Sequence, residues 1–412
     1  MSVLYSVFSG VKPTDILAAI LSILCLYVFR FYYKHFTRVN PLPGPLPIPL
    51  IGSLAIFKKD IDAWFFELNK SYVHDGLYEL NIAGNRQIVI TRAEHVERFL
   101  SSTSSSINHI MRTANNGLLD LFDLEKKGVG LNHSYQHWKL NRHIFAQAVM
   151  PLSSTDKPCQ YINQLFEEMS GYWMEFKSKD DNEITIDIST WMRRFTSDFI
   201  SLLTTGDHIS TINYYYRKVK NEKMTKEMIE SENFIESINV FVSDNQVLFI
   251  PRILRNLPFI KDRVDSMLNN NYYFYDRLEQ IVRKRRKLIA NTDKLSYAPD
   301  TKQFDLLTSL IITNTPLDPH PQKNLDESMS RPLTDGEIRG VLFDAFVAGT
   351  DTTVNTFCFA LYYISHHPRV KRKIVEEIET VFKDDPNKRI TLEDLEKLKY
   401  IEAVIKETSR IR

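Results

Sequence analysis

The segment that most restricts the fold is the run from Ile16 to Phe29, ILAAILSILCLYVF, which contains neither a charge nor a proline. Extended to Tyr33 and taken as a helix, it covers roughly 27 Å, enough to cross the hydrocarbon of a bilayer. We predict that residues 1–39 form a single-pass membrane anchor; a buried core helix or a cleaved signal peptide is the alternative. The basic residues lie mainly after the run, which predicts a cytosolic body; they are Arg30, Lys34, His35 and Arg38.

A proline-rich stretch follows the anchor, from Asn40 to Ser53. Alternating prolines favour a stiff, extended backbone without internal hydrogen bonds. We interpret residues 40–54 as a hinge that spaces the body from the membrane. A polyproline ligand for a partner domain is the other interpretation.

Charge and cysteine content exclude several classes of protein. The 52 basic and 51 acidic residues leave a net charge of +1, so no broad basic surface is available for nucleic acid. The three cysteines are far apart in the sequence, which argues against a disulfide framework and a CxxC metal site.

The body, residues 55–412, is predicted to be mainly α with a small β-sheet, an α+β fold. A helix over 61–72 precedes two strands, 78–82 and 87–91, that alternate around a turn as in a hairpin. Helical periodicity then dominates, over 135–150, 160–178, 187–204, 222–241, 262–291, 303–313, 335–364, 368–382 and 391–411. Residues 314–333 are polar and rich in proline, and are predicted to form a loop.

The predicted helix from residue 335 has a well-defined start and a weak middle. Thr334 and Glu337 form a capping-box pattern. Further on, AGTDTT (348–353) is poor helix material, because glycine and threonine both have low helix propensity. The spacing puts small side chains on one face, where either a flat ligand or a closely crossing helix could pack; they are Ala345, Gly349, Thr352 and Thr356.

In this setting AGTDTT resembles the oxygen-binding helix of the cytochrome P450 family. The resemblance implies that Asp351 and Thr352 relay protons to bound oxygen, and that Ala348 and Gly349 flank the oxygen pocket.

Trp138 and Arg142 form a second motif, WxxxR, whose side chains share one helical face. Both are pure hydrogen-bond donors suited to carboxylates. Alone the pattern is weak, but it is similar to the family's helix that holds a haem propionate. His133 and His137 nearby form an i,i+4 pair for which no third zinc ligand is apparent.

Glu407 and Arg410, in the last predicted helix, can bridge at i,i+3. A solvated surface pair is the ordinary interpretation. The segment also resembles the family's ExxR helix, in which the buried pair has a structural role. Ser409 stands where the family usually has leucine.

The resemblance spans residues 40–412 and implies haem b as cofactor, with dioxygen and an apolar small molecule as substrates. It further implies an NADPH-dependent flavin reductase as electron donor and a place in the endoplasmic reticulum membrane, in contact with lipid. The family continues about a hundred residues past ExxR to a cysteine loop. We therefore expect a chain that is incomplete at its C-terminus, lacks the axial cysteine and is inactive. A non-catalytic tethered protein that competes for reductase or lipid is the alternative.

The substrate itself is not named by the sequence, and steroid, fatty acid, terpenoid and foreign compound all stay open. Two sequons test the predicted topology. Asn69 and Asn132 are predicted to remain unglycosylated because they face the cytosol.

Overall fold

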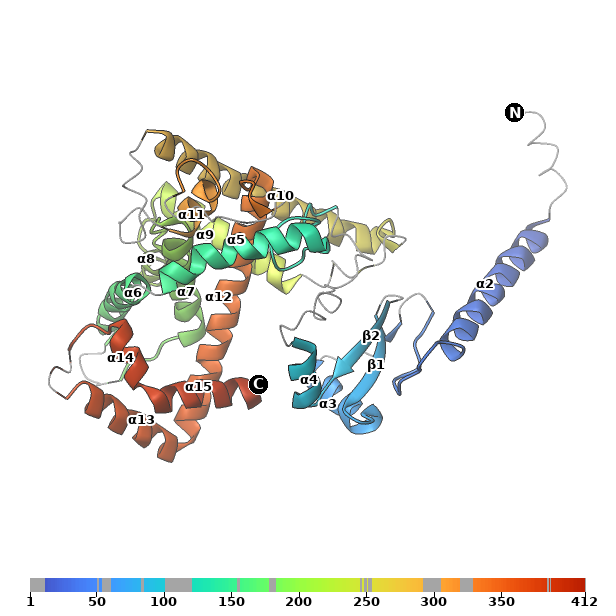
Figure 1. Ribbon diagram of the computed structural model, residues 1–412, viewed down its shortest axis with the longest axis horizontal. Helices are drawn as coiled ribbons and strands as arrows, with labels where there is room; N and C mark the ends of the chain where they lie inside the picture. The colour runs from blue at the N-terminus through green and yellow to red at the C-terminus, as the bar shows by residue number, and fades with distance from the viewer. Residues whose placement is uncertain are drawn as a thin grey trace. The chain divides into compact units, whose positions relative to one another are not determined.

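The computed structural model divides the chain into two units, residues 1–116 and 117–412, which are described separately (Figure 1). The residues that the structure describes are 12–49, 52–53, 61–82, 85–100, 121–153, 156–177, 183–244, 247, 250, 254–291, 305–318, 329–383, 385 and 387–411.

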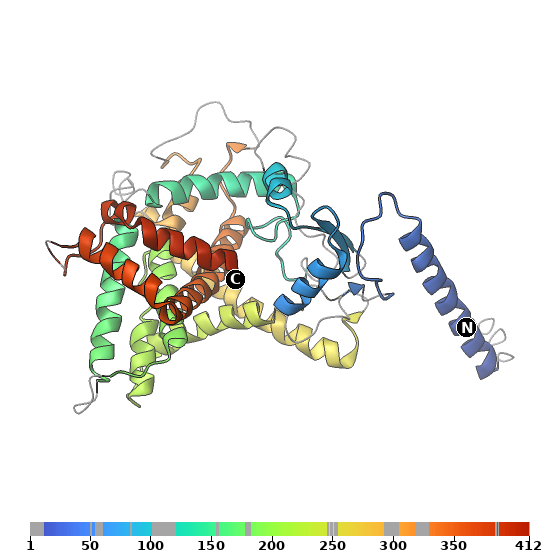
Figure 2. The ribbon, with the colours of Figure 1, turned by 90° about the horizontal axis from the view of Figure 1, so that it is seen from below.

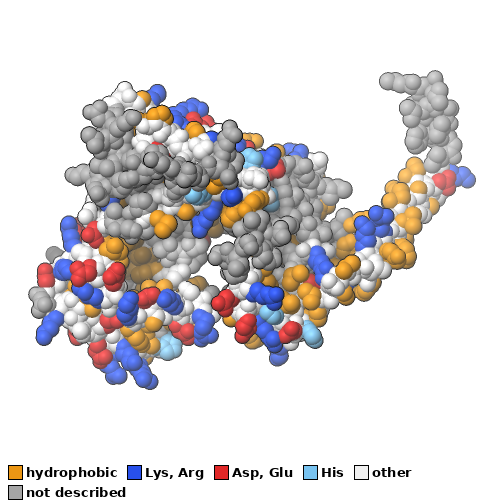
Figure 3. Space-filling model, viewed as in Figure 1, with side chains coloured by type: hydrophobic (Ala, Val, Ile, Leu, Met, Phe, Trp, Pro, Cys, Tyr) orange, Lys and Arg blue, Asp and Glu red, His pale blue; other side chains and the backbone are white. Residues whose placement is uncertain are grey.

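The first unit begins with helix α2, Pro13–Phe36, which buries none of its residues. Pro13 suits the first helical position, because its missing N–H would have no partner there. Hydrophobic side chains run along α2 in Figure 3. By length and composition, it is the one helix among the described residues able to cross a membrane.

The rest of the first unit is a helix, a hairpin and a short helix: α3 (Ile61–Tyr72), β1 (Leu77–Ile82), β2 (Asn85–Ile90) and α4 (Ala93–Leu100). The strands pair antiparallel from Leu77 opposite Ile90 to Ile82 opposite Asn85, which confirms the predicted hairpin. A small core fills the space between α3 and β1; it consists of Trp64, Leu68, Tyr78 and Leu80. The sequence prediction did not include α4.

The regular elements described in the second unit are all helices, which together with the hairpin of the first unit confirms the predicted fold class of mainly α with a small sheet. Its helices are α5 (Tyr135–Ser153), α6 (Lys157–Met174), α7 (Ile188–Thr205), α8 (Thr211–Val219), α9 (Lys226–Ser243), α10 (Pro258–Ala290), α11 (Leu306–Ile312), α12 (Asp335–His366), α13 (Pro368–Val381), α14 (Leu392–Lys397) and α15 (Lys399–Ile411).

Helix α8 was missed because its stabilising contact comes from another helix. Asp198, on α7, is fully buried and accepts hydrogen bonds from the backbone N–H groups of Thr211 and Ile212, at 2.8 and 3.1 Å. A carboxylate at this position satisfies donors that have no partner within the helix. No residue adjacent to α8 in the sequence carries that information.

The predicted helix 391–411 is divided at Leu398 into α14 and α15. Thr391 and Asp394 form a capping box that starts α14. The start of α15 is held instead by Glu377 of α13, which accepts from the N–H groups of Tyr400 and Ile401, at 2.6 and 3.0 Å. The break therefore depends on a carboxylate from a different helix.

Helix α12 passes through the second unit, and the other helices gather around it (Figures 1 and 2). Its first half is buried in the main hydrophobic core, where Val341, Leu342, Phe343 and Phe346 are each at most 1% exposed. Helices α7, α9, α10 and α15 contact it. The core thus fixes the helix that carries the AGTDTT sequence.

Candidate active site on helix α12

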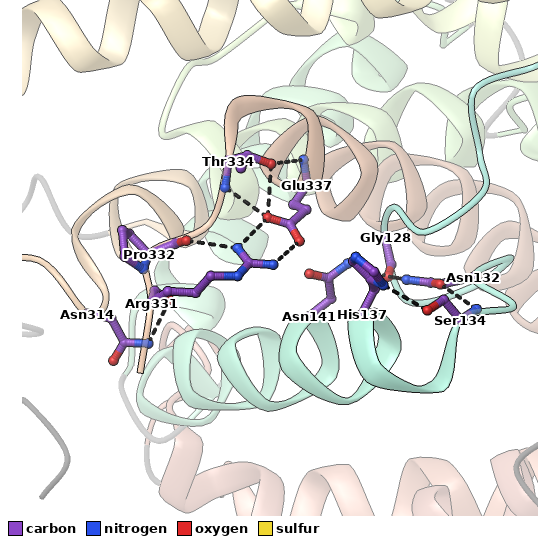
Figure 4. Close-up of polar contacts among 10 residues, drawn as sticks. All are labelled: Gly128, Asn132, Ser134, His137, Asn141, Asn314, Arg331, Pro332, Thr334 and Glu337. Atoms are coloured by element: carbon purple, nitrogen blue, oxygen red, sulfur yellow. Dashed lines mark hydrogen bonds and ion pairs between the residues drawn. The ribbon is translucent and has the colours of Figure 1, made fainter. Parts of the chain in front are cut away.

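The start of α12 is the best-defined part of the site region. Thr334 and Glu337 form the predicted capping box, with Glu337 accepting from the Thr334 N–H at 2.9 Å. Arg331 donates two hydrogen bonds to the same carboxylate, at 2.9 and 2.7 Å (Figure 4). Burial alone would raise the pKa of Glu337, but hydrogen bonds from Arg331 and Thr334 outweigh it and lower the pKa below its ordinary value.

A loop before α5 that contains Gly128 and Gly130 is held against α12 by hydrogen bonds and close packing. Asp344 accepts from the N–H groups of Val129 and Gly130, at 2.5 and 2.8 Å. Gly128 has φ +67°, and a Cβ there would lie 2.3 Å from Asp344 Oδ2 and 2.7 Å from the carbonyl oxygen of Gly340. Only glycine permits both this backbone conformation and this close approach.

The same loop sets the start of α5. The side chains of Asn132 and Asn141 both donate to the carbonyl oxygen of Gly128, at 3.1 and 2.9 Å (Figure 4). The lone acid Asp344 in the apolar run VLFDAFVAG and the pair Gly128 and Gly130 are the signals that sequence analysis could have used.

Helix α5 carries Trp138 and Arg142. Trp138 is half-buried and stacks on Tyr135, with ring centroids 6.1 Å apart. Arg142 is exposed and makes no ion pair with any described residue. His137 Nδ1 hydrogen-bonds to Ser134 at 2.7 Å (Figure 4), and no metal-binding group of His, Cys, Asp or Glu occurs among the described residues.

The small-residue strip of α12 is divided between two surroundings. Gly349 lies against Ile200 of α7, whose Cδ1 would be 2.4 Å from an added Cβ. Ala345 packs against the main core. Thr352 and Ala348 are both exposed, and the Thr352 hydroxyl donates to the carbonyl oxygen of Ala348. The strip is therefore covered by a crossing helix at one point and open at another. Helix α7 crosses closely at Gly349, whereas Thr352 and the neighbouring Ala348 form an open side.

Asp351 lies beside a cation that the sequence analysis missed. Arg193 of α7 donates to Asp351 Oδ1 at 2.9 Å and to the side-chain oxygen of Asn239, on α9, at 3.0 Å. Both charged side chains are partly exposed, at 29% and 23%. The acid of the predicted relay is thus tied to two neighbouring helices, and no local sequence pattern links residue 193 to residue 351.

Glu407 and Arg410 form the predicted i,i+3 bridge, with two hydrogen bonds of 2.7 Å. Their side chains are 55% and 71% exposed, so the pair lies at the surface of the described chain. Glu407 lines a mainly apolar cavity of about 390 Å³ between α12, α13 and α15.

A second cavity, of about 200 Å³, is bounded by α7, α9, α10 and α12 and is lined partly by Phe346. Residues two positions apart on a helix point about 200° apart. This cavity therefore lies on the opposite side of α12 from Ala348, away from the open side.

Known proteins similar to this chain agree on one family. Residues 42–412 match the cytochrome P450 family. Probable cytochrome P450 513F1 of Dictyostelium discoideum is 26% identical over 95% of this chain and 74% of its own length. Cytochrome P450 4d2 of Drosophila melanogaster is 26% identical over 90% of this chain and 69% of its own length.

A solved structure shares the fold. The crystal structure of a mutant cytochrome P450DA heme domain has a TM-score of 0.64, with 18% identity, over 90% of this chain and 70% of its own. Since the family match extends from the proline-rich segment to the end of α15, the chain belongs to the cytochrome P450 family.

Proposed function

We propose that this chain forms the oxygen-side wall and one propionate-holding helix of a haem b monooxygenase that uses dioxygen to oxidise an apolar small molecule. The observation that carries the proposal is the open side of α12, where the small residues Ala348 and Thr352 are both exposed one turn apart, directly after the part of the helix that is packed in the main core.

The residues present fit a haem. Ala348 and Thr352 are small and exposed, so their side chains leave a surface against which a flat ring system could lie. Arg142 is exposed and has no ion-pair partner among the described residues, and a guanidinium is well matched to a propionate carboxylate. Trp138 supplies an indole N–H one helical turn away.

The side chains of Thr352 and Asp351 would transfer protons on the open side of α12. When bound, a haem supplies the iron at which dioxygen is activated. The Thr352 hydroxyl donates to the Ala348 carbonyl oxygen, which leaves its own lone pairs as acceptors toward the open side. Arg193 places a positive charge 2.9 Å from Asp351, so this acid is held in a fixed position as the next proton carrier.

None of the three cysteines in the sequence is proposed as the axial ligand. Cys25 lies in the apolar helix α2. Cys159 is buried in α6, and burial, with Asp156 and Asp394 nearby, raises the pKa of its thiol, which disfavours the thiolate that binds iron. Cys358 packs against a hydrophobic cluster beside Val354.

The electron donor is proposed to be a separate NADPH-dependent flavin reductase. We place the protein in the endoplasmic reticulum membrane, with α2 as the anchor and the body in the cytosol, because the basic residues follow the apolar run.

A haem titration of the purified full chain in detergent micelles tests the proposal. We expect saturable binding, followed by haem absorbance, and about tenfold weaker binding in R142A, since a hydrogen bond to a charged group contributes about 1.5–3 kcal/mol. K139A, an exposed cation on the same helix, is the control and is expected to bind haem like the wild type.

The result of the haem titration distinguishes the monooxygenase from the non-catalytic tethered protein. Absence of saturable haem binding would favour the non-catalytic tethered protein. A thiolate-type band in the reduced, carbon-monoxide-treated chain would contradict the assignment of the cysteines.

A further inference from the structure

The end of the apolar helix is fastened to the hairpin by one buried acid. Glu79, on β1, is 5% exposed. Its carboxylate lies 2.6 Å from Arg38 Nε and accepts from Arg86 Nε at 2.9 Å and from the N–H of Leu42 at 3.1 Å. Two cations from different segments therefore meet at a single negative charge.

The backbone of the proline-rich segment is held at the same place. The N–H of Glu79 donates to the carbonyl oxygen of Pro43 at 2.8 Å, and Arg86 Nη1 donates to that of Val39 at 2.9 Å. A Cβ on Gly44 would lie 2.1 Å from the carbonyl oxygen of Glu79. These contacts make a rigid junction of α2, the segment after it and the hairpin.

The junction encloses a cavity of about 200 Å³ whose lining includes Phe31, Lys34, His35, Arg38, Glu79 and Arg86. Three of these side chains are cations, Lys34, Arg38 and Arg86, and one is a carboxylate, Glu79, so the lining has a net charge of +2 with histidine neutral. Lys34 is exposed and makes no ion pair within the described part of the chain. The cavity thus offers uncompensated positive charge.

The position of the cavity indicates which kind of anion it binds. It lies at the C-terminal end of α2, which ends at Phe36 and is long enough to cross a membrane. If α2 spans the bilayer, this end lies where hydrocarbon meets water, the level of lipid phosphate groups. Phe31 gives the cavity an apolar wall on the hydrocarbon side.

We propose that this cavity binds the phosphate group of an anionic membrane lipid, with Lys34 as the direct cationic contact. The guanidinium nitrogens of Arg38 and Arg86 already contact Glu79 or backbone carbonyl oxygens, so these two side chains add positive charge to the lining rather than direct contacts. The inference rests on the proposed membrane insertion of α2. Bound lipid would fix the orientation of the hairpin relative to the bilayer, because residues that line the cavity also hold the hairpin to the end of α2.

The test compares lipid capture by the full chain. The chain is reconstituted in vesicles of phosphatidylcholine with a trace of fluorescent phosphatidic acid, and the phosphatidic acid that remains with the protein after detergent extraction is measured. We expect enrichment over a fluorescent phosphatidylcholine analogue, and about tenfold less enrichment in K34A, as for the loss of a charged hydrogen bond.

The control is K12A, which removes an exposed lysine at the opposite end of the same helix. Equal losses in K34A and K12A would mean general attraction to anionic lipid and would overturn the site. If inorganic phosphate displaces the lipid at equal concentration, the site binds free phosphate and the lipid assignment fails. A chain that does not enter phosphatidylcholine vesicles at all would instead contradict the proposed anchor.

Discussion

At the scale of single residues, the sequence predicted contacts between neighbours and missed contacts between distant positions. The capping box of Thr334 and Glu337 was predictable because its partners are three residues apart. The ion pair of Arg193 and Asp351 was not, because 158 residues separate them. The chemistry of Asp351 as an acid was visible in AGTDTT, whereas the cation that positions it was visible only in the fold.

The Glu337 carboxylate stabilises the start of α12. E337A removes the capping box and a carboxylate that is 6% exposed and paired with Arg331, so we expect the free energy of unfolding to fall by about 2 kcal/mol. Because the folded-state pKa of Glu337 is lowered, its stabilisation is present above the unfolded-state pKa and is lost as pH falls through the folded-state value.

Urea unfolding at neutral pH and below about pH 4 checks this prediction, since an unperturbed glutamate titrates near that pH. The difference between wild type and E337A should shrink in acid. E396A, an exposed glutamate on α14, is the control and should unfold like the wild type. A pH-independent difference would show that the carboxylate charge is not what stabilises the start of α12.

At the scale of helices, boundaries set by local signals were predicted and those set by tertiary contacts were not. Helices α5 and α12 begin where the periodicity and capping residues place them. The separation of α14 from α15 depends on Glu377 of α13. The strip of small residues on α12 shows the same limit. The sequence predicts that its side chains are small, but not which neighbouring helix packs against them.

Helix α7 crosses α12 closely at Gly349. A valine side chain at position 349 would overlap Ile200, so we expect G349V to lower the free energy of unfolding by about 2 kcal/mol more than A348V does. Both substitutions add a β-branched residue to the same helix, which makes A348V a matched control.

I200A in the G349V background should recover part of the loss, because it removes the overlapping atoms. Thermal unfolding of these three variants and the wild type provides the comparison. Equal destabilisation by G349V and A348V would mean that α7 does not approach α12 closely at the glycine.

At the scale of the whole molecule, composition and periodicity correctly predicted a mainly helical chain with an early hairpin. The predicted anchor corresponds to α2, which is apolar and unburied. The two sequons, however, do not test topology equally. Asn132 is 1% exposed and donates to the Gly128 carbonyl oxygen, so folding hides it on either side of a membrane. Asn69 is exposed on α3.

Asn69 is therefore the informative site. In microsomes, we expect no endoglycosidase-sensitive mass shift from the Asn69 sequon, because a cytosolic body never meets the glycosylation machinery. An N-terminal extension that carries a sequon is the positive control for the opposite side. Modification at Asn69 would reverse the proposed orientation.

If haem lies against the open side of α12, as proposed, the haem affinity of the A348F variant should be reduced. Ala348 is exposed, so phenylalanine there should leave the fold intact while it occupies the space of the ring. T353F is the control, because Thr353 is also exposed but points about 140° away around the helix. We predict about tenfold weaker haem binding in A348F and unchanged binding in T353F. Wild-type haem affinity in A348F would show that haem does not lie against this side of α12.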